Sequence, residues 1–281
     1  MCKILAIGSS SVNIFKALES KDFTILKFKG ISMKSMINET KHYHLLLNFL
    51  KNKTFDYCIH VFGIVDLNFY YYYKKFIMNE EPNIFKTPEL YCNLIKTLPN
   101  IKKHIVINVP YSPTSTEFFI PLLKRYLFDY TDQINNQLIP KKECSIKFRQ
   151  TMIDKFNRTL EKNCIINNYK FINFNKYIIN KNYTVNKLFI VTYSPVNIHL
   201  FFEHVLLVIL YKTDLHFLNN ENLEYKMNKD FDEWKIYKNN KALIKKNPIL
   251  SPKDYEKYKI NMNKFHLQIK AVIKYLENKS N

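Results

Sequence analysis

Glycine is scarce in this chain, and its positions constrain the fold more than any other feature. Only 3 of the 281 residues are glycine, about 1% where roughly 7% is ordinary. Gly8, Gly30 and Gly63 each end an apolar run. Glycine is required where the backbone takes a positive φ or where another backbone approaches closely. We therefore expect tight turns or close approaches at the ends of three strands.

Strand-like and helix-like patterns alternate along the chain. Short apolar runs, bounded by turn residues, predict strands at 3–7, 23–29, 57–62, 104–109 and 170–174. Apolar residues at helical spacing predict helices at 11–21, 40–51, 87–98 and 145–162, with further helices starting near Ser115 and beside His199. This alternation predicts an α/β fold, with a mainly parallel sheet and helices on both faces. In such sheets ligands bind beyond the carboxyl ends of the strands, where the three glycines fall.

Composition narrows the class of protein. The 43 basic and 24 acidic residues give a net charge of +19, but the lysines are spread along the whole chain rather than clustered in the stripe that marks a nucleic-acid face. We therefore expect no specific nucleic-acid partner. Five cysteines without close pairing indicate reduced thiols and a cytoplasmic location. The apolar runs are too short for a membrane span, which needs about 20 residues.

Four short segments, in order along the chain, resemble the sequence blocks of the SGNH (GDSL-type) hydrolases. They are 8–11 (Gly-Ser-Ser-Ser), 29–33 (Lys-Gly-Ile-Ser-Met), 63–66 (Gly-Ile-Val-Asp) and 197–200 (Asn-Ile-His-Leu). The resemblance covers roughly residues 1 to 213. It implies a flavodoxin-like three-layer fold and chemistry on acyl esters.

The resemblance also implies roles for individual residues. Ser10 takes the position of the nucleophile and His199 that of the catalytic base. The amide of Gly30 takes the position of an oxyanion-hole donor. The remaining residues implied at the oxyanion or ligand site are Gly63, Asp66 and Asn197.

Three positions depart from the family pattern. Val65 replaces the asparagine that gives the oxyanion hole a side-chain donor, Val196 replaces the acid that precedes the histidine, and Ser9 replaces an aspartate. A histidine base works best with a partner that fixes its tautomer and stabilises its charge. Loss of one oxyanion donor costs about 10²–10³ in rate. An enzyme with these replacements is expected to be slow, or to have lost its chemistry.

Several residues also have plain structural interpretations. Ser10 suits the N-cap of a helix, since its hydroxyl can accept from a nearby amide. Asp66 fits either a site beyond a strand or a cap on the segment that follows it. The tyrosines at 70–73 could stack on sugar or base rings, or simply be partly buried. No histidine and cysteine spacing typical of zinc occurs, so no metal and no cofactor is expected.

The chain changes character after the region of resemblance. We expect an α/β domain over 1–213 and, over 214–281, a polar extension followed by a C-terminal amphipathic helix. In 252–281 the apolar residues follow at alternating spacings of three and four. This helix is predicted to dock on the domain or on a second copy of the chain, which would make a homo-oligomer.

The resemblance thus implies a serine-dependent ester hydrolase or acyl transferase acting on a small acyl ester, such as the O-acetyl ester of a sugar. The alternative is a non-catalytic module of the same fold that binds a ligand or a protein. A third class, a nucleotide or nucleic-acid protein on a Rossmann-like sheet, is disfavoured because the Gly-x-Gly-x-x-Gly pattern is missing.

Overall fold

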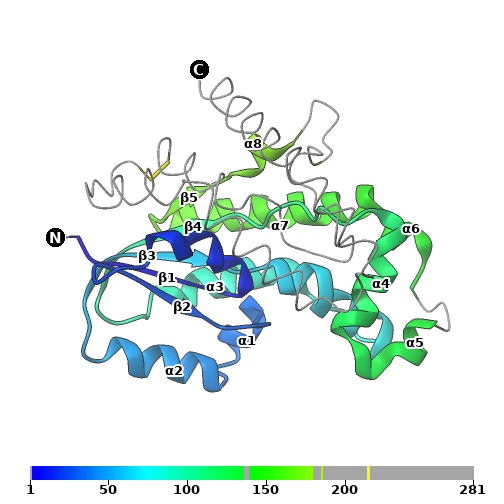
Figure 1. The fold of residues 1–281 in the computed structure, drawn as a ribbon, viewed down its shortest axis with the longest axis horizontal. Coiled ribbons are helices and arrows are strands. Elements are labelled where there is room, and N and C mark those ends of the chain that lie inside the picture. Colours follow the sequence, from blue (N-terminus) through cyan, green and yellow to red (C-terminus); the bar gives the residue numbers. More distant parts are fainter. Residues whose placement is uncertain (1, 136–138, 180–184, 186–213, 216–281) are drawn as a thin grey trace, which may run out of the picture.

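A five-stranded parallel sheet forms the centre of the molecule (Figure 1). The computed structural model describes residues 2–135, 139–179, 185 and 214–215. The strands are β1 (Ile4–Gly8), β2 (Phe23–Lys27), β3 (Phe55–Val61), β4 (Ile101–Ile107) and β5 (Lys170–Ile172). Their order across the sheet is β2-β1-β3-β4-β5. This order is that of the flavodoxin-like folds, so the predicted α/β sheet is confirmed.

Helices connect the strands. In chain order, the helices of the described residues are η1 (Ser10–Leu18), α1 (Met33–Ile37), α2 (Lys41–Leu50), η2 (Asp66–Tyr70), η3 (Tyr73–Ile77), η4 (Ile84–Lys86), α3 (Thr87–Ile95), α4 (Thr116–Tyr126), η5 (Phe128–Tyr130), α5 (Thr131–Asn135), α6 (Lys141–Cys144), α7 (Ile146–Ile166) and α8 (Asn175–Ile178). Of the η segments, η1, η4 and η5 are 3-10 helices, and η2 and η3 are π-helices.

The helices form a layer on each face of the sheet. On one face, η1 packs against β1, β2 and β3. On the other, α1 contacts α2 and α3, and α3 contacts α7. Figure 1 shows η1 and α2 on opposite sides of β1 and β2. The expected three-layer arrangement is therefore confirmed for the described residues.

The local pattern of apolar residues explains the core. Ile4, Leu5 and Ile7 of β1 are fully buried, as expected for a central parallel strand covered on both faces. In η1 the buried residues Val12, Phe15 and Leu18 recur every third position, which matches the three residues per turn of a 3-10 helix.

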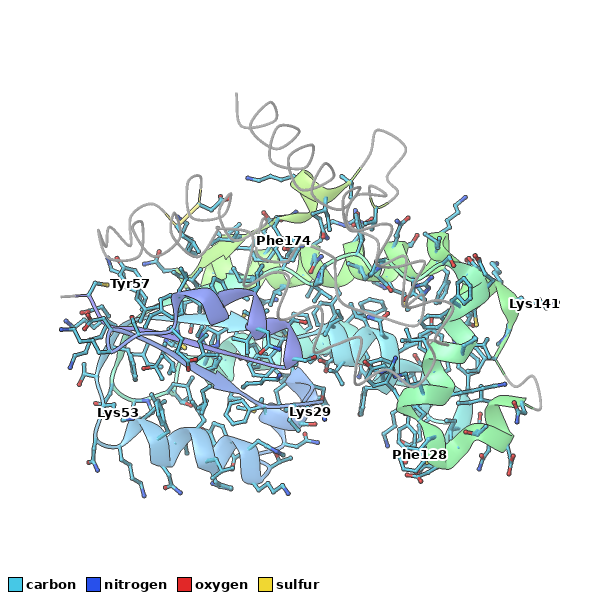
Figure 2. The ribbon with its side chains drawn as sticks, viewed as in Figure 1. Lys29, Lys53, Tyr57, Phe128, Lys141 and Phe174 are labelled. Atoms are coloured by element: carbon cyan, nitrogen blue, oxygen red, sulfur yellow. The ribbon has the colours of Figure 1, made fainter. Side chains whose placement is uncertain are left out.

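The carboxyl ends of all five strands lie on one side of the sheet, because the strands run in the same direction. Lys29, which follows β2, lies on this side, whereas Lys53, which precedes β3, lies at the amino ends of the strands (Figure 2). We call the side with the carboxyl ends the carboxyl edge. Parallel α/β sheets bind ligands there.

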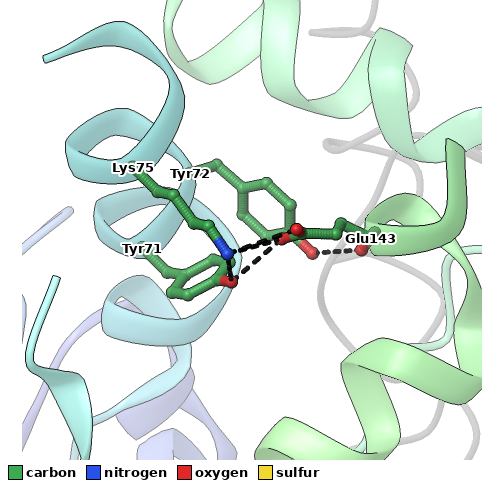
Figure 3. Close-up of polar contacts among 4 residues, drawn as sticks. All are labelled: Tyr71, Tyr72, Lys75 and Glu143. Atoms are coloured by element: carbon green, nitrogen blue, oxygen red, sulfur yellow. Dashed lines mark hydrogen bonds and ion pairs between the residues drawn. The ribbon is translucent and has the colours of Figure 1, made fainter. Parts of the chain in front are cut away.

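The tyrosine run has a structural role. Tyr71 and Tyr72 are buried, and their hydroxyls donate to Glu143 of α6, at 2.9 Å to its carboxylate and 2.7 Å to its carbonyl (Figure 3). The ammonium of Lys75 lies 3.2 Å from the same carboxylate. These two rings lie between η2 and η3, join this region to α6, and are buried rather than presented to a ligand.

Some predictions fall largely outside the described residues. They are the boundary between 1–213 and 214–281 and the amphipathic helix at 252–281. In the described ranges, no helix combines the length and apolar character that a membrane crossing requires.

Candidate functional site

The strand order identifies one place at the carboxyl edge where a ligand crevice is expected. β1 pairs with both β2 and β3, and the chain leaves β1 toward one end of the sheet and β3 toward the other. A ligand crevice forms at such a reversal of strand order. The segments that leave β1 and β3 here begin at Ser9 and Phe62.

Ser10 is the first residue of η1, directly after the turn that leaves β1. Its side chain is partly exposed. The hydroxyl makes no hydrogen bond to any of the residues that the structure describes, so it does not act as the N-cap that the sequence also allowed. Ser10 is therefore a partly exposed serine, without a hydrogen-bond partner among the described residues, at the place in the sheet where a ligand is expected.

The hydroxyls of the two neighbouring serines also lack a hydrogen-bond partner among the described residues. The Oγ atoms of Ser9 and Ser11 are both buried and have no hydrogen-bond partner in the described part of the chain. Buried polar atoms are nearly always paired. Two unpaired hydroxyls on either side of Ser10 mark this turn as unusual for a purely structural segment.

Gly8 brings the turn close to β3. A Cβ at Gly8 would overlap the carbonyl oxygen of Val61, and the amide of Ser9 donates to that same oxygen at 3.2 Å. The close backbone approach expected at a strand end is therefore found here. Only glycine allows the chain to leave β1 against β3.

Gly30 meets one of the two expected requirements, a positive φ. Its φ is +73°, and a Cβ added to it would meet no atom within 4 Å. The expectation of a tight turn or a close approach is therefore met at Gly30 by the turn, which needs the left-handed conformation. The amide of Phe28 donates to the carbonyl of Gly8 at 2.8 Å, which holds the exit of β2 beside the exit of β1.

Asp66 ties two of the candidate segments together. Its carboxylate accepts hydrogen bonds from the amides of Met33 (2.8 Å) and Lys34 (3.1 Å) at the start of α1. The sequence allowed a ligand contact or a cap on the following segment, whereas Asp66 caps a helix 33 residues earlier in the chain. Complete burial raises the pKa of Asp66 to about 6, against the lowering effect of these amides.

Gly63 and Val65 complete the turn after β3. Gly63 has a φ of +104°, and a Cβ there would overlap the side chain of Val109. Val65 is partly exposed and offers no donor. The buried amide of Asn68 does not replace it, because its nitrogen donates to the carbonyl of Ile64 at 3.0 Å.

The end of β4 carries a set of buried amides that the sequence analysis missed. Asn157 accepts from the amide of Val109 and donates to its carbonyl, both at 2.8 Å. Asn175 donates to that carbonyl at 3.1 Å and accepts from the amide of Tyr111, also at 3.1 Å. Asn108 accepts from the amide of Phe174 at 3.0 Å. Single asparagines far apart in sequence gave no signal of this clamp.

A second group missed by sequence lies in the sheet itself. Cys58 and His60 of β3 and His104 of β4 place their ligand atoms within 4.8 Å of one another. The expectation of no metal site rested on spacing along the chain. Alternation within β3 and the register with β4 bring the three side chains to one face instead.

Two predicted site residues, His199 and Asn197, lie outside the described residues, as does Val196. The described residues of the candidate site are therefore Ser10, Gly30, Gly63 and Asp66. Their arrangement around the β1–β3 switch point is that of a flavodoxin-like α/β protein with a serine-bearing turn.

Comparison with known proteins gives matches to solved structures only. No family model matches the sequence, and neither does any curated protein. The chain is similar to a GDSL-like lipase from Bacteroides thetaiotaomicron, with 13% identity, a TM-score of 0.48, and 76% of this chain and 87% of the lipase covered. It is also similar to a catalytic mutant of an acetylxylan esterase from Geobacillus stearothermophilus, with 13% identity, a TM-score of 0.46, and 78% and 94% covered.

Proposed function

We propose that this chain is a serine-dependent ester hydrolase or acyl transferase with Ser10 as its nucleophile. The observation that supports this most directly is the uncommitted Ser10 hydroxyl at the switch point of the sheet. The family resemblance of the segments around Ser10, Gly30, Gly63 and His199 supplies the kind of chemistry. The substrate class is a small acyl ester, such as the O-acetyl ester of a sugar.

The reaction follows from the roles of these groups. Ser10 Oγ attacks the acyl carbon while His199 takes the hydroxyl proton, and the amides of Ser10 and Gly30 hold the developing oxyanion. Collapse of this intermediate breaks the ester bond, and His199 returns the proton to the departing alcohol. Water, or the hydroxyl of an acceptor, then takes the acyl group from Ser10 by the same steps in reverse order.

Asp66 serves this reaction by positioning. Its bonds to the amides of Met33 and Lys34 hold the start of α1, three and four residues beyond Gly30. The φ of +73° at Gly30 sets the direction of the turn. Together they fix the segment that carries the proposed oxyanion donor without contact between Asp66 and the substrate.

Covalent labelling tests the nucleophile. A fluorophosphonate should add one label per chain, read by intact mass, and Ser10→Ala should abolish the label. Ser9→Ala and Ser11→Ala are matched controls in the same turn and should both be labelled. An unlabelled wild-type chain, or a label retained in Ser10→Ala, would contradict the proposal.

Kinetics tests the pair. With p-nitrophenyl acetate, Ser10→Ala and His199→Ala should each remove nearly all activity, and the double variant should lose little more, because the two residues act as a unit. Ser10 Oγ and a ring nitrogen of His199 should lie within about 3.2 Å in an experimental structure with ligand. Gly30→Ala should abolish acyl-enzyme formation while leaving most of the fold intact.

The valine at position 65 offers a gain-of-function test. Because Val65 supplies no donor, turnover should be slow. Val65→Asn should raise kcat, by up to about 10²-fold if the new amide reaches the oxyanion. The control Val65→Thr places a shorter polar group at the same position and should give a smaller gain.

The second candidate function is a non-catalytic binding module of the same fold. It is favoured by Val65, which leaves the oxyanion hole without its side-chain donor. Absence of labelling and of Ser10-dependent esterase activity would support this module. Ligand binding that is weakened by Gly30→Ala would then be the expected property.

A further inference from the structure

Cys58, His60 and His104 form the strongest concentration of metal-ligating groups in the described part of the chain. Cys58 and His60 alternate along β3 and so point to the same face of the sheet. His104 of β4 is the register partner of Cys58. The sulfur and the ring nitrogens lie within 4.8 Å of one another. Two imidazoles and a thiol are the ligands that zinc and copper prefer.

The two histidines already face each other as metal ligands do. His60 Nε2 and His104 Nδ1 are 3.0 Å apart. Two nitrogens held by one ion at about 2.0–2.1 Å lie about 3.3 Å apart at the tetrahedral angle and about 3.5 Å apart in a trigonal three-ligand site. An ion between them therefore needs a separation about 0.3–0.5 Å larger. It would take the place of the hydrogen that the two rings now share.

A second group orients one of these ligands. His60 Nδ1 lies 3.0 Å from the hydroxyl of Tyr91 on α3. When His60 donates its Nδ1 hydrogen to that oxygen, the lone pair of Nε2 points at His104. Ligating histidines usually donate their other ring N–H to an oxygen in this way, which fixes the tautomer.

Metal binding sets the protonation state of the ligands. A bound ion needs neutral imidazoles and a deprotonated thiolate. An ion bound at this cluster therefore displaces the thiol proton of Cys58, and binding should weaken at low pH.

Charge favours one kind of ion. His60 is fully buried, whereas His104 is half-buried. No described carboxylate is hydrogen-bonded or ion-paired to the three residues. A thiolate and two neutral imidazoles balance the charge of a monovalent ion, whereas a divalent ion would leave one buried positive charge.

We propose that Cys58, His60 and His104 form a buried three-ligand site for one transition-metal ion of the copper–zinc class, with Cu⁺ the better fit. The site lies within the sheet, is separate from the Ser10 turn, and would link β3 to β4. It does not depend on the proposed hydrolase function.

Metal titration of the full reduced chain tests this site. Cu⁺ supplied anaerobically against a chromophoric copper chelator should bind at one ion per chain, with a thiolate-to-copper charge-transfer absorption. Zn²⁺ in a parallel titration should bind at the same stoichiometry but more weakly. Failure of both ions to bind would overturn the proposal.

Variants separate the site from incidental thiol binding. Cys58→Ser and His104→Gln should each weaken binding by more than about 100-fold, and Tyr91→Phe by about 10- to 100-fold. Cys144→Ser, another buried thiol, and His44→Gln, an exposed histidine, should bind as the wild type does. Binding retained in Cys58→Ser, or lost equally in Cys144→Ser, would contradict the site.

A stability readout covers variants that fold poorly. His104→Gln keeps an acceptor for His60 at the partly exposed rim of the cluster and is the variant least disturbing to the core. Saturating Cu⁺ should raise the Tm of the wild type and of Cys144→Ser by mass action. It should leave the Tm of His104→Gln unchanged.

Discussion

The chain segments after β4 and after β1, both at the carboxyl edge of the sheet, differ in whether their buried polar groups are hydrogen-bonded. At the end of β4, buried amides of Asn108, Asn157 and Asn175 hydrogen-bond the backbone around Val109. At the end of β1, the buried hydroxyls of Ser9 and Ser11 find no partner among the described residues. We call these two regions the β4 corner and the β1 corner. The buried asparagine side chains of the β4 corner are hydrogen-bonded, whereas two buried hydroxyls of the β1 corner have no partner among the described residues.

The difference separates a structural corner from a candidate site. A paired buried network stabilises one arrangement of the chain, whereas an unpaired buried hydroxyl costs free energy in the unliganded state. Real proteins tolerate such a cost mainly at functional positions. The contrast thus supports the β1 corner, rather than the β4 corner, as the place where a ligand is handled.

The largest expected effect concerns the backbone contact of the β1 corner. Gly8→Ala puts a Cβ onto the carbonyl oxygen of Val61, a rigid backbone atom. We expect a loss of more than about 3 kcal/mol in the free energy of unfolding, measured by urea denaturation. Gly30→Ala is the matched control, because it meets only a strained φ and should lose roughly 1–2 kcal/mol.

Equal losses in the two variants would contradict the different roles given to the two glycines. A loss in Gly8→Ala smaller than in Gly30→Ala would show that β1 and β3 can separate at this corner.

The next effect is the pH dependence that Asp66 gives to stability. Its pKa is raised by burial from 3.8 to about 6, so between these values the folded chain holds a proton that the unfolded chain has lost. Stability should therefore fall as pH rises from about 4 to 6, and the contribution of Asp66 should be constant above that range. The total change is about 3 kcal/mol.

Asp66→Asn should remove this part of the pH profile in urea unfolding at pH 4, 5, 6 and 7. It should also be less stable at every pH, because its amide nitrogen faces one of the two α1 amides. Asp129→Asn, at an exposed carboxylate, should keep the wild-type slope. A wild-type slope in Asp66→Asn would show that Asp66 titrates alike in both states.

The third effect tests the paired corner. Asn157→Ala leaves the buried amide of Val109 without its acceptor, and an unsatisfied buried group costs about 1–3 kcal/mol in addition to the lost bond. We expect a loss of about 2–3 kcal/mol in the free energy of unfolding. Asn163→Ala, on the same helix α7, removes only a bond to the carbonyl of Thr159 and should lose less than about 1 kcal/mol. Similar losses would mean that the clamp contributes little.

The sequence predicted the scaffold better than the contacts that hold it. Alternating patterns gave the parallel sheet, because the period of apolar residues reflects burial of a strand or helix directly. Gly8, Gly30 and Gly63 were placed correctly as positions of a close approach or a positive φ. The spacing of three between Val12, Phe15 and Leu18 also matches the 3-10 geometry of η1, although the sequence pattern predicts only a helix there.

Long-range polar pairs could not be predicted in this way. Asp66 bonds to Met33 across 33 residues, and His60 lies beside His104 across 44. Such contacts depend on the register of neighbouring strands and on where each loop returns, neither of which a single sequence encodes locally. The asparagine clamp around Val109 was missed for the same reason.

The smallest effect gives the sharpest contrast, because two buried serines at one edge should respond with opposite signs. Ser32 caps α1, with its hydroxyl accepting from the amide of Ser35 at 2.9 Å, so Ser32→Ala should lose about 1 kcal/mol. Ser9→Ala removes a buried hydroxyl that has no partner and should gain up to about 1 kcal/mol, since the desolvation penalty disappears. Both changes delete a single oxygen, so cavity effects nearly cancel in the comparison. A loss in Ser9→Ala as large as that in Ser32→Ala would mean that the Ser9 hydroxyl is satisfied, and the contrast between the two corners would disappear.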